Sequence, residues 1–89
     1  MKTVHLVIKN ETGMHARPAG IFVKAAQAFQ SQVQISFSGR TVNGKSVMSL
    51  MTLGLQKGSE FDLIVDGSDE EAAATSLTQL VDTEFQHGS

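Results

Sequence analysis

A chain of 89 residues has room for one hydrophobic core, so we expect a single domain over residues 1–89. The net charge is only −2. The absence of cysteine excludes disulfides, thiolate catalysis and cysteine-ligated metal, and it fits a reducing compartment. The apolar run at residues 4–8 is too short for a signal peptide or a membrane span, so we expect a cytoplasmic protein without membrane insertion.

The charged residues are distributed unevenly along the chain. All seven Lys and Arg lie at or before Lys57, whereas eight of the nine acidic residues lie at or after Glu60. This asymmetry predicts a basic face for phosphate groups or acidic partners, and a separate acidic face. The alternative is that the two halves interleave and the charges mix. Direct nucleic-acid binding is not expected, because the chain has no Trp or Tyr and no run of basic residues.

The N-terminal third changes from strand to helix periodicity. Residues 3–9 alternate apolar and polar side chains, which predicts a half-buried strand. Apolar residues then recur at the spacing of one helix face, and we expect a helix over residues 16–28. The apolar side chains of the strand are Val4, Leu6 and Ile8, and those of the helix are Phe22, Ala25, Ala26 and Phe29.

A hairpin and a short helix are predicted next. Residues 33–37 alternate again, and Ser38-Gly39 is expected to turn the chain into a short strand over residues 40–43. Ser46 is placed to cap a short helix, and Gly54 is placed to end it. The apolar face of this helix comprises Val47, Leu50 and Met51.

The last part of the chain predicts a strand followed by a helix. Residues 61–65 point Phe61, Leu63 and Val65 to one side. Ser68 and Glu71 have the spacing of a capping box, which would make Ser68 the N-cap of the final helix. The helix face carries Ala73, Leu77, Leu80 and Val81. The tail over residues 85–89 is expected to fray.

The predicted order of elements is β-α-β-β-α-β-α. Four strands with one apolar face each, and helices with matching apolar stripes, favour an α+β open-faced sandwich. In it, a four-stranded antiparallel sheet is covered on one face by three helices, and the other sheet face is solvated.

The residues able to carry chemistry concentrate in Gly13-Met14-His15-Ala16-Arg17-Pro18-Ala19, where the first helix is expected to begin. Proline is tolerated in a first helical turn, so Pro18 places His15 at or just before the helix start. There the backbone N–H groups and the positive end of the helix macrodipole favour a neutral, nucleophilic imidazole and an added anion.

The neighbours of His15 suit a phosphoryl group. Arg17 offers charged donors for phosphoryl oxygens, while Gly13 and Ala16 leave little bulk in the way of a partner. A helix terminus stabilises an anion by only about 0.3 to 2 kcal/mol, so the group would be held without being trapped. The alternative for His15 is a solvated turn histidine. No role is assigned to His5 or His87, and no metal or cofactor is expected, because the three histidines share no metal-ligand spacing.

Residues 13–19 closely resemble the active-site signature of the HPr family of phosphocarrier proteins. Residues 45–55, Lys45-Ser46-Val47-Met48-Ser49-Leu50-Met51-Thr52-Leu53-Gly54-Leu55, are similar to the family's second signature, around a serine phosphorylated by a regulatory kinase in Gram-positive bacteria. The resemblance extends over nearly the whole chain in length and in element order, and it implies the open-faced sandwich.

The resemblance implies a phosphoryl carrier of the bacterial phosphoenolpyruvate:sugar phosphotransferase system, not an independent enzyme. Enzyme I would pass phosphate to Nδ1 of His15, and a sugar-specific IIA domain would remove it. Arg17 and the backbone of Ala16 and Arg17 would hold the phosphoryl oxygens.

Ser46 has two interpretations: a simple N-cap, or a regulatory phosphorylation site. The second implies an HPr kinase/phosphorylase and a catabolite-control transcription factor as further partners. Candidate partner contacts are Met48, Met51, Lys24 and Lys45. Met51 fits a core position better, because it shares the face of Val47 and Leu50, and Met48 fits both interpretations.

Three alternatives stay open. A regulatory paralogue without phosphoryl transfer is disfavoured by His15, because the known type lacks that histidine. An α/β binding module without phosphate chemistry is disfavoured by the pair of signatures. A carrier of the nitrogen-related branch is the nearest competitor, although the methionine-rich helix after Ser46 favours the Gram-positive sugar type. A monomer is expected.

Overall fold

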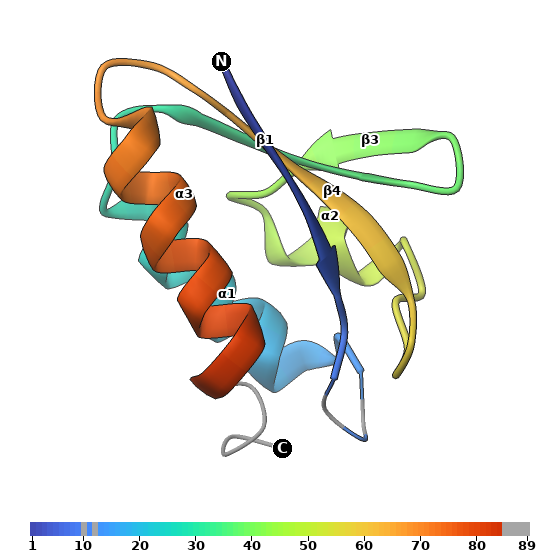
Figure 1. Ribbon diagram of the computed structural model, residues 1–89. Coiled ribbons are helices and arrows are strands. Elements are labelled where there is room, and N and C mark those ends of the chain that lie inside the picture. The colour runs from blue at the N-terminus through green and yellow to red at the C-terminus, as the bar shows by residue number, and fades with distance from the viewer. Residues whose placement is uncertain (10, 12, 85–89) are drawn as a thin grey trace.

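The computed structural model describes the chain except for residues 10, 12 and 85–89, so His87 and the predicted fraying tail lie outside the described residues. Figure 1 shows the elements in the predicted order, with helices and strands that differ from the predicted bounds by a few residues. They are β1 (Lys2–Val7), α1 (Ala16–Gln27), β2 (Gln32–Phe37), β3 (Arg40–Asn43), α2 (Val47–Met51), β4 (Glu60–Asp66), α3 (Glu70–Gln79) and the π-helical turn η1 (Leu80–Glu84).

The four strands form one antiparallel sheet in the order β1-β4-β2-β3. The register places Leu6 of β1 opposite Phe61 of β4, and Ile35 of β2 opposite Leu63 of β4. Residues paired across antiparallel strands point to the same sheet face. The alternating apolar residues of three strands therefore line one continuous surface.

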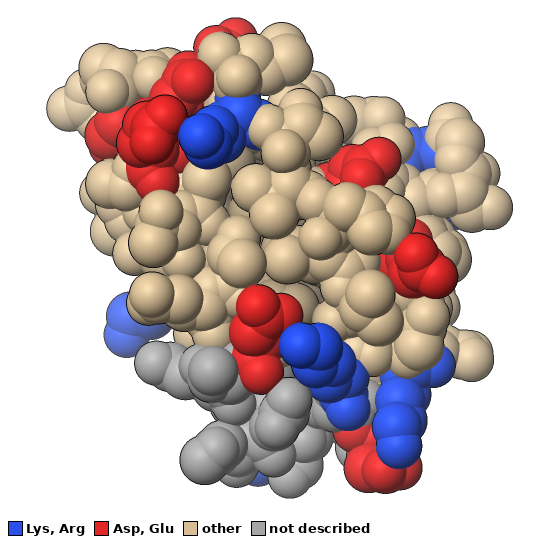
Figure 2. Space-filling view, viewed as in Figure 1, with Lys and Arg blue, Asp and Glu red and all other residues tan. Residues whose placement is uncertain are grey.

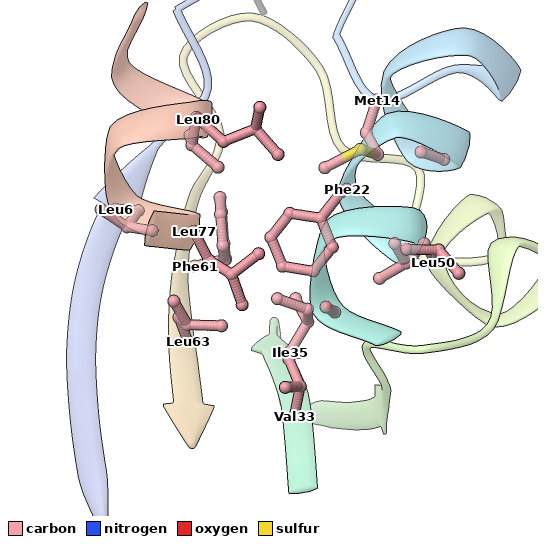
Figure 3. Packing of buried hydrophobic residues seen from close by; sticks show 14 of the residues in the cluster. Leu6, Met14, Phe22, Val33, Ile35, Leu50, Phe61, Leu63, Leu77 and Leu80 are labelled. Atoms are coloured by element: carbon pink, nitrogen blue, oxygen red, sulfur yellow. The ribbon is translucent and has the colours of Figure 1, made fainter. Parts of the chain in front are cut away.

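The helices cover that apolar surface. Figure 3 shows the buried side chains of β1, β4 and β2 pointing toward α1, α2 and α3, with Phe22 of α1 and Leu77 of α3 between the layers. The opposite sheet face carries polar residues such as Gln34 and Asp62. The predicted open-faced sandwich is confirmed, because each amphipathic element buries its single apolar face.

Helices α1 and α2 pack against each other in opposite directions. Lys45, just before α2, donates from Nζ to the carbonyl oxygen of Phe29, just after α1, at 2.8 Å. At the other end, the backbone N–H of Met14, just before α1, donates to the carbonyl of Leu55, just after α2, at 2.9 Å. The C-terminal end of α2 therefore faces the segment that contains His15, and its N-terminal end lies beside the C-terminal end of α1.

The predicted capping box of the last helix is wrong. Asp69, not Ser68, occupies the N-cap position, and its side chain makes no capping hydrogen bond. Its carboxylate instead accepts hydrogen bonds from the backbone N–H of Gln30 and from the N–H and hydroxyl of Ser31. These bonds, led by the one from the Ser31 hydroxyl, lower the pKa of Asp69. A tertiary tie between two turns thus replaces the local cap. The last helix also ends earlier than expected, with η1 continuing from Leu80.

The predicted separation of a basic face from an acidic face fails on one side of the molecule. Figure 2 shows Lys and Arg side chains beside Asp and Glu side chains at several places. Lys2 pairs with Glu71 at 3.2 Å, and Lys9 pairs with Asp82 at 3.5 Å. The charges mix there because β1, from the basic half of the sequence, lies beside β4 and α3, from the acidic half.

Candidate functional site

His15 is the N-cap residue of α1. Its backbone is extended, with φ −97° and ψ −169°, and its carbonyl accepts the first helical hydrogen bond from the N–H of Ala19 at 3.0 Å. Pro18 is buried in the first turn, where its missing N–H is not needed. The N–H groups of Ala16 and Arg17 precede the helical ladder and lie at the positive end of the helix dipole. The position that Pro18 predicted for His15 is confirmed.

The two ring nitrogens of His15 are in different surroundings. Nε2 is buried and has no hydrogen-bond partner among the described residues. An unpaired buried polar atom costs about 1 to 3 kcal/mol, and such atoms in native proteins call for an explanation in function. The imidazole also makes no capping hydrogen bond to the helix. The ring as a whole is half-buried, so the part of it that another molecule can reach does not include Nε2.

The loop before His15 is braced by the segment after α2. Gly13 has φ +69°, and a Cβ placed there would lie 2.6 Å from the carbonyl oxygen of Leu55 and 2.8 Å from Cα of Gln56. Gly13 is thus required by backbone packing, and the expectation that its small size clears the way for a partner stays a prediction. Ala16, in contrast, is exposed. Sequence reasoning missed Leu55 and Gln56, because both act through backbone atoms.

The surface around His15 is positively charged in sequence and in structure. The first turn of α1 has no acidic residue, Lys24 lies in its last turn, and both Arg17 and Lys24 are exposed. No Asp or Glu occurs between residues 13 and 59. The α1 and α2 surface therefore offers cations to phosphate and to acidic proteins.

Helix α2 presents methionines to solvent. Met48 is 79% exposed and Met51 is 45% exposed, so the prediction that Met51 belongs to the core is wrong, as is the core alternative for Met48. Leu50 is the buried residue of this helix. A helix of five residues is too short to turn a second large side chain into the core. Ile21 of α1 is 37% exposed. Exposed methionine offers a flexible, polarizable contact surface.

Ser46 and Lys45 lie at the opposite end of α2 from His15. Ser46 is the N-cap, and its Oγ accepts a hydrogen bond from the backbone N–H of Ser49 at 3.3 Å. Lys45 is half-buried, with its ammonium on the Phe29 carbonyl at the C-terminal end of α1. Ser46 therefore lies at the end of α2 that is away from the segment carrying His15.

His5 differs from His15 in its position in the fold and in its hydrogen-bond partners. It lies on the solvated sheet face, where Nδ1 is 2.9 Å from Asp62 and Nε2 is 2.8 Å from Glu60. The hydrogen bond with Glu60, followed by that with Asp62, raises the pKa of His5. Both nitrogens can donate at once only in the imidazolium, so the two carboxylates favour the cationic form of this ring.

We expect a pH-dependent stabilisation from His5. Because its folded pKa is raised, the contribution is full below the ordinary pKa of about 6.5 and is lost as pH rises through the folded pKa. The melting temperature of the wild-type chain should exceed that of His5→Gln at about pH 6, and the gap should shrink by about pH 9. A gap that stays constant or widens with pH would contradict this assignment.

Among the described residues, no cluster of three or more His, Cys, Asp or Glu side chains is arranged to hold a metal ion. None of the helices in the described part of the chain has the length and apolarity needed to cross a membrane.

Comparison with known proteins identifies the class to which this fold and site belong. The family model described as the PTS HPr component phosphorylation site matches residues 2–83. The chain therefore belongs to the HPr family, the phosphocarrier proteins of the phosphotransferase system.

Solved structures of relatives share the fold over nearly their full length. HPr-C-His from Thermoanaerobacter tengcongensis is 44% identical over 96% of both chains, with a TM-score of 0.92. The phosphocarrier protein HPr from Bacillus anthracis str. Ames is 35% identical, over 90% of this chain and 95% of that one, with a TM-score of 0.86. Crh, the Bacillus subtilis catabolite repression containing protein, described as a dimer with a swapping domain, is 39% identical over 94% of this chain and 97% of that one, with a TM-score of 0.76.

Proposed function

We propose that Nδ1 of His15 accepts a phosphoryl group from phosphorylated enzyme I and donates it to a IIA domain of a sugar transporter. The observation that carries this proposal is the burial of Nε2 in a histidine at a helix N-terminus, which leaves Nδ1 as the reachable nucleophile. The lone pair of Nδ1 attacks phosphorus, and the bond between phosphorus and the donor breaks. The reverse exchange, with the next acceptor as nucleophile, completes the relay.

The site suits a carrier because its hold on phosphate is weak. The helix dipole and the backbone N–H groups of Ala16 and Arg17 contribute about 0.3 to 2 kcal/mol toward an anion. This is enough to orient a phosphoryl group at His15 and too little to prevent its departure. The imidazole lies half-buried at a helix start, so we expect each docking protein to complete the reaction site. We therefore assign the chain the role of a relay and not of an independent catalyst.

The docking surface follows from the exposed residues of α1 and α2. Met48, Met51 and Ile21 are apolar and exposed, and Arg17 and Lys24 add positive charge. A mixed apolar and basic surface fits acidic partner proteins, and flexible methionine suits several partners in turn. Lys45 is placed at its edge, where its ammonium already caps α1.

A direct test uses purified enzyme I and phosphoenolpyruvate. The expected product is one phosphate per chain, labile in acid and stable in alkali, which a IIA domain then removes. No uptake, or uptake of acid-stable phosphate, would contradict the proposed function.

Arg17→Ala is expected to fold normally and to transfer slowly. The guanidinium is exposed in the first turn of α1, so its loss leaves the core intact. Charge-assisted hydrogen bonds to the phosphoryl group contribute roughly 1.5 to 3 kcal/mol, which corresponds to a roughly ten- to hundredfold lower transfer rate. Rapid-quench kinetics checks the rate, and thermal melting checks the fold. A variant that fails to fold would make Arg17 structural, and an unchanged rate would remove it from the site.

We further propose that Ser46 is phosphorylated by an HPr kinase/phosphorylase, and that this state binds a catabolite-control transcription factor. Support comes from its position as the N-cap of α2 and from the similarity of residues 45–55 to the family's second signature. A phosphate there would lie at the end of α2 that is away from the segment carrying His15. We expect its effect on transfer to act on a docked acidic partner that covers both helices.

Ser46→Asp is expected to slow phosphoryl uptake from enzyme I while leaving the fold intact. Aspartate is a good N-cap residue, so the start of α2 keeps its cap while negative charge is added to the docking surface. The rate should fall mainly through a higher KM for this chain, and the difference should shrink at high salt. Ser46→Asn is the neutral control with the same capping ability. Equal transfer rates for the two variants would count against a regulatory Ser46.

We propose a monomer in the cytoplasm that binds proteins and not nucleic acid directly. The sugar branch of the phosphotransferase system is favoured by the exposed methionines of α2. Because Crh is described as a swapped dimer, the oligomeric state needs its own measurement. Light scattering across a range of protein concentrations should give the mass of a single chain.

A further inference from the structure

Helix α2 is too short to hold its own position. It has five residues, one buried side chain, Leu50, and no basic residue in its own last turn. Isolated helices of this length are unstable in water, because nucleation is not repaid by enough hydrogen bonds. Its orientation must come from contacts made by other elements.

Arg40 of β3 provides such a contact at the C-terminal end of α2. Its guanidinium donates from one nitrogen to the carbonyl oxygen of Thr52 at 2.9 Å, and from the other to the Thr52 hydroxyl oxygen at 3.2 Å. The Thr52 hydroxyl in turn donates to the carbonyl of Ser49 at 2.6 Å. One side chain therefore supplies donors, directly or by relay, to two terminal carbonyl oxygens and places a cation at the negative end of the helix.

This end of α2 is the one that faces His15. Thr52 lies three residues before Leu55, whose carbonyl accepts a hydrogen bond from the N–H of Met14. The exposed Met51 directly precedes Thr52. Arg40 is thus linked to the segment that carries His15 by the hydrogen bonds to Thr52, the stretch of chain from Thr52 to Leu55, and the hydrogen bond between Leu55 and Met14.

We propose that Arg40 is a positioning residue: its two-pronged contact with Thr52 fixes the C-terminal end of α2 and so sets the affinity of partner proteins that dock over α1 and α2. Arg40 acts through Thr52 and touches neither the phosphoryl group nor His15. This inference rests on the proposed function, because it takes α2 as part of the docking surface. A lysine at the same place cannot make both contacts, since an ammonium lacks the planar fork.

The test is a kinetic comparison of variants in phosphoryl uptake from enzyme I. Arg40→Ala should raise the KM for this chain roughly five- to tenfold with kcat within about twofold, which is the pattern of lost docking without lost chemistry. Arg40→Lys should recover only part of the affinity. Lys2→Ala, which removes a cation paired with Glu71 elsewhere on the surface, is the matched control and should keep the wild-type KM.

A double-mutant cycle separates positioning from direct contact with the partner. Thr52→Val removes the hydroxyl and should raise KM less than Arg40→Ala does. If Arg40 acts through Thr52, the double variant should be little worse than Arg40→Ala alone. Additive effects of the two substitutions, or full recovery of KM by Arg40→Lys, would overturn the proposal.

Amide hydrogen exchange gives a readout that needs no partner. In Arg40→Ala and Arg40→Lys, the amides of Thr52 and Leu53 should exchange faster, while those in α3 should be unchanged. Unchanged exchange in α2 would also overturn the proposal. If the wild-type chain took up no phosphate, the proposed function would fail on its own, and the exchange data would still decide whether Arg40 holds α2.

Discussion

Replacing His15 with alanine is expected to abolish uptake of acid-labile phosphate while leaving the fold unchanged. The imidazole makes no capping hydrogen bond, so its removal leaves the start of α1 much as it was. The other described histidine cannot substitute for it, because both nitrogens of His5 are occupied by Glu60 and Asp62. Phosphate uptake from enzyme I, with melting curves for the fold, checks this result.

His5→Ala is the matched control for that experiment. It removes an imidazole from the opposite, solvated sheet face and should take up phosphate as the wild type does. Acid-labile phosphate on the His15→Ala chain, or its loss in His5→Ala, would contradict the proposal that His15 accepts the phosphoryl group.

Gly13→Ala is expected to lower both the stability of the fold and the rate of phosphoryl transfer, with an effect second only to that of His15→Ala. The position has φ +69°, and a Cβ there would overlap the backbone of Leu55 and Gln56. The left-handed backbone alone costs about 1 to 2 kcal/mol for a residue other than glycine, and backbone atoms cannot move aside as a flexible side chain would. We expect a loss of at least about 2 kcal/mol in the free energy of unfolding, together with slower phosphoryl transfer, because His15 is displaced.

The turn between β2 and β3 offers the control for Gly13. Gly39 has φ +82°, but a Cβ there would meet nothing within 4 Å. Gly39→Ala should therefore show the backbone strain without the clash and without any change in transfer rate. Denaturant unfolding and transfer kinetics measure both effects. Equal losses of stability in the two variants would mean that the contact with Leu55 is not tight.

Most of the fold could be predicted from the sequence because its signals are local. Alternation at period two placed β1, β2 and β4, and the helix-spaced residues around Phe22 and Leu77 lie in the core as expected. Pro18 located the start of α1 and hence His15, because the stereochemistry of proline acts within one turn. Each of these inferences needed only a few neighbouring residues.

The errors arose where distant segments meet. The carboxylate of Asp69 bonds to the turn around Ser31, and local capping rules contain no information about such a partner. The acidic and basic halves mix because the order of the strands places β1 beside β4. Met51 shares a helix face with Leu50 and is nevertheless exposed, because α2 is short and lies at the rim of the core.

The site itself divides in the same way. His15 and Arg17 come from one continuous signature and were found together. The brace formed by Leu55 and Gln56 comes from 40 residues further along the chain and acts through backbone atoms. No pattern of side chains could reveal this contact. The glycine at position 13 is the sequence feature that reflects the close approach of the Leu55 and Gln56 backbone.

We propose that the phosphoryl group resides on Nδ1 of His15, because Nε2 is buried. The most direct measurement is NMR of the ¹⁵N-labelled chain after phosphorylation by enzyme I, in which coupling to phosphorus identifies the nitrogen that is bonded to it. We expect coupling at Nδ1 of His15 and an unchanged signal from His5. Phosphorus bonded to Nε2, or to any other residue, would contradict it.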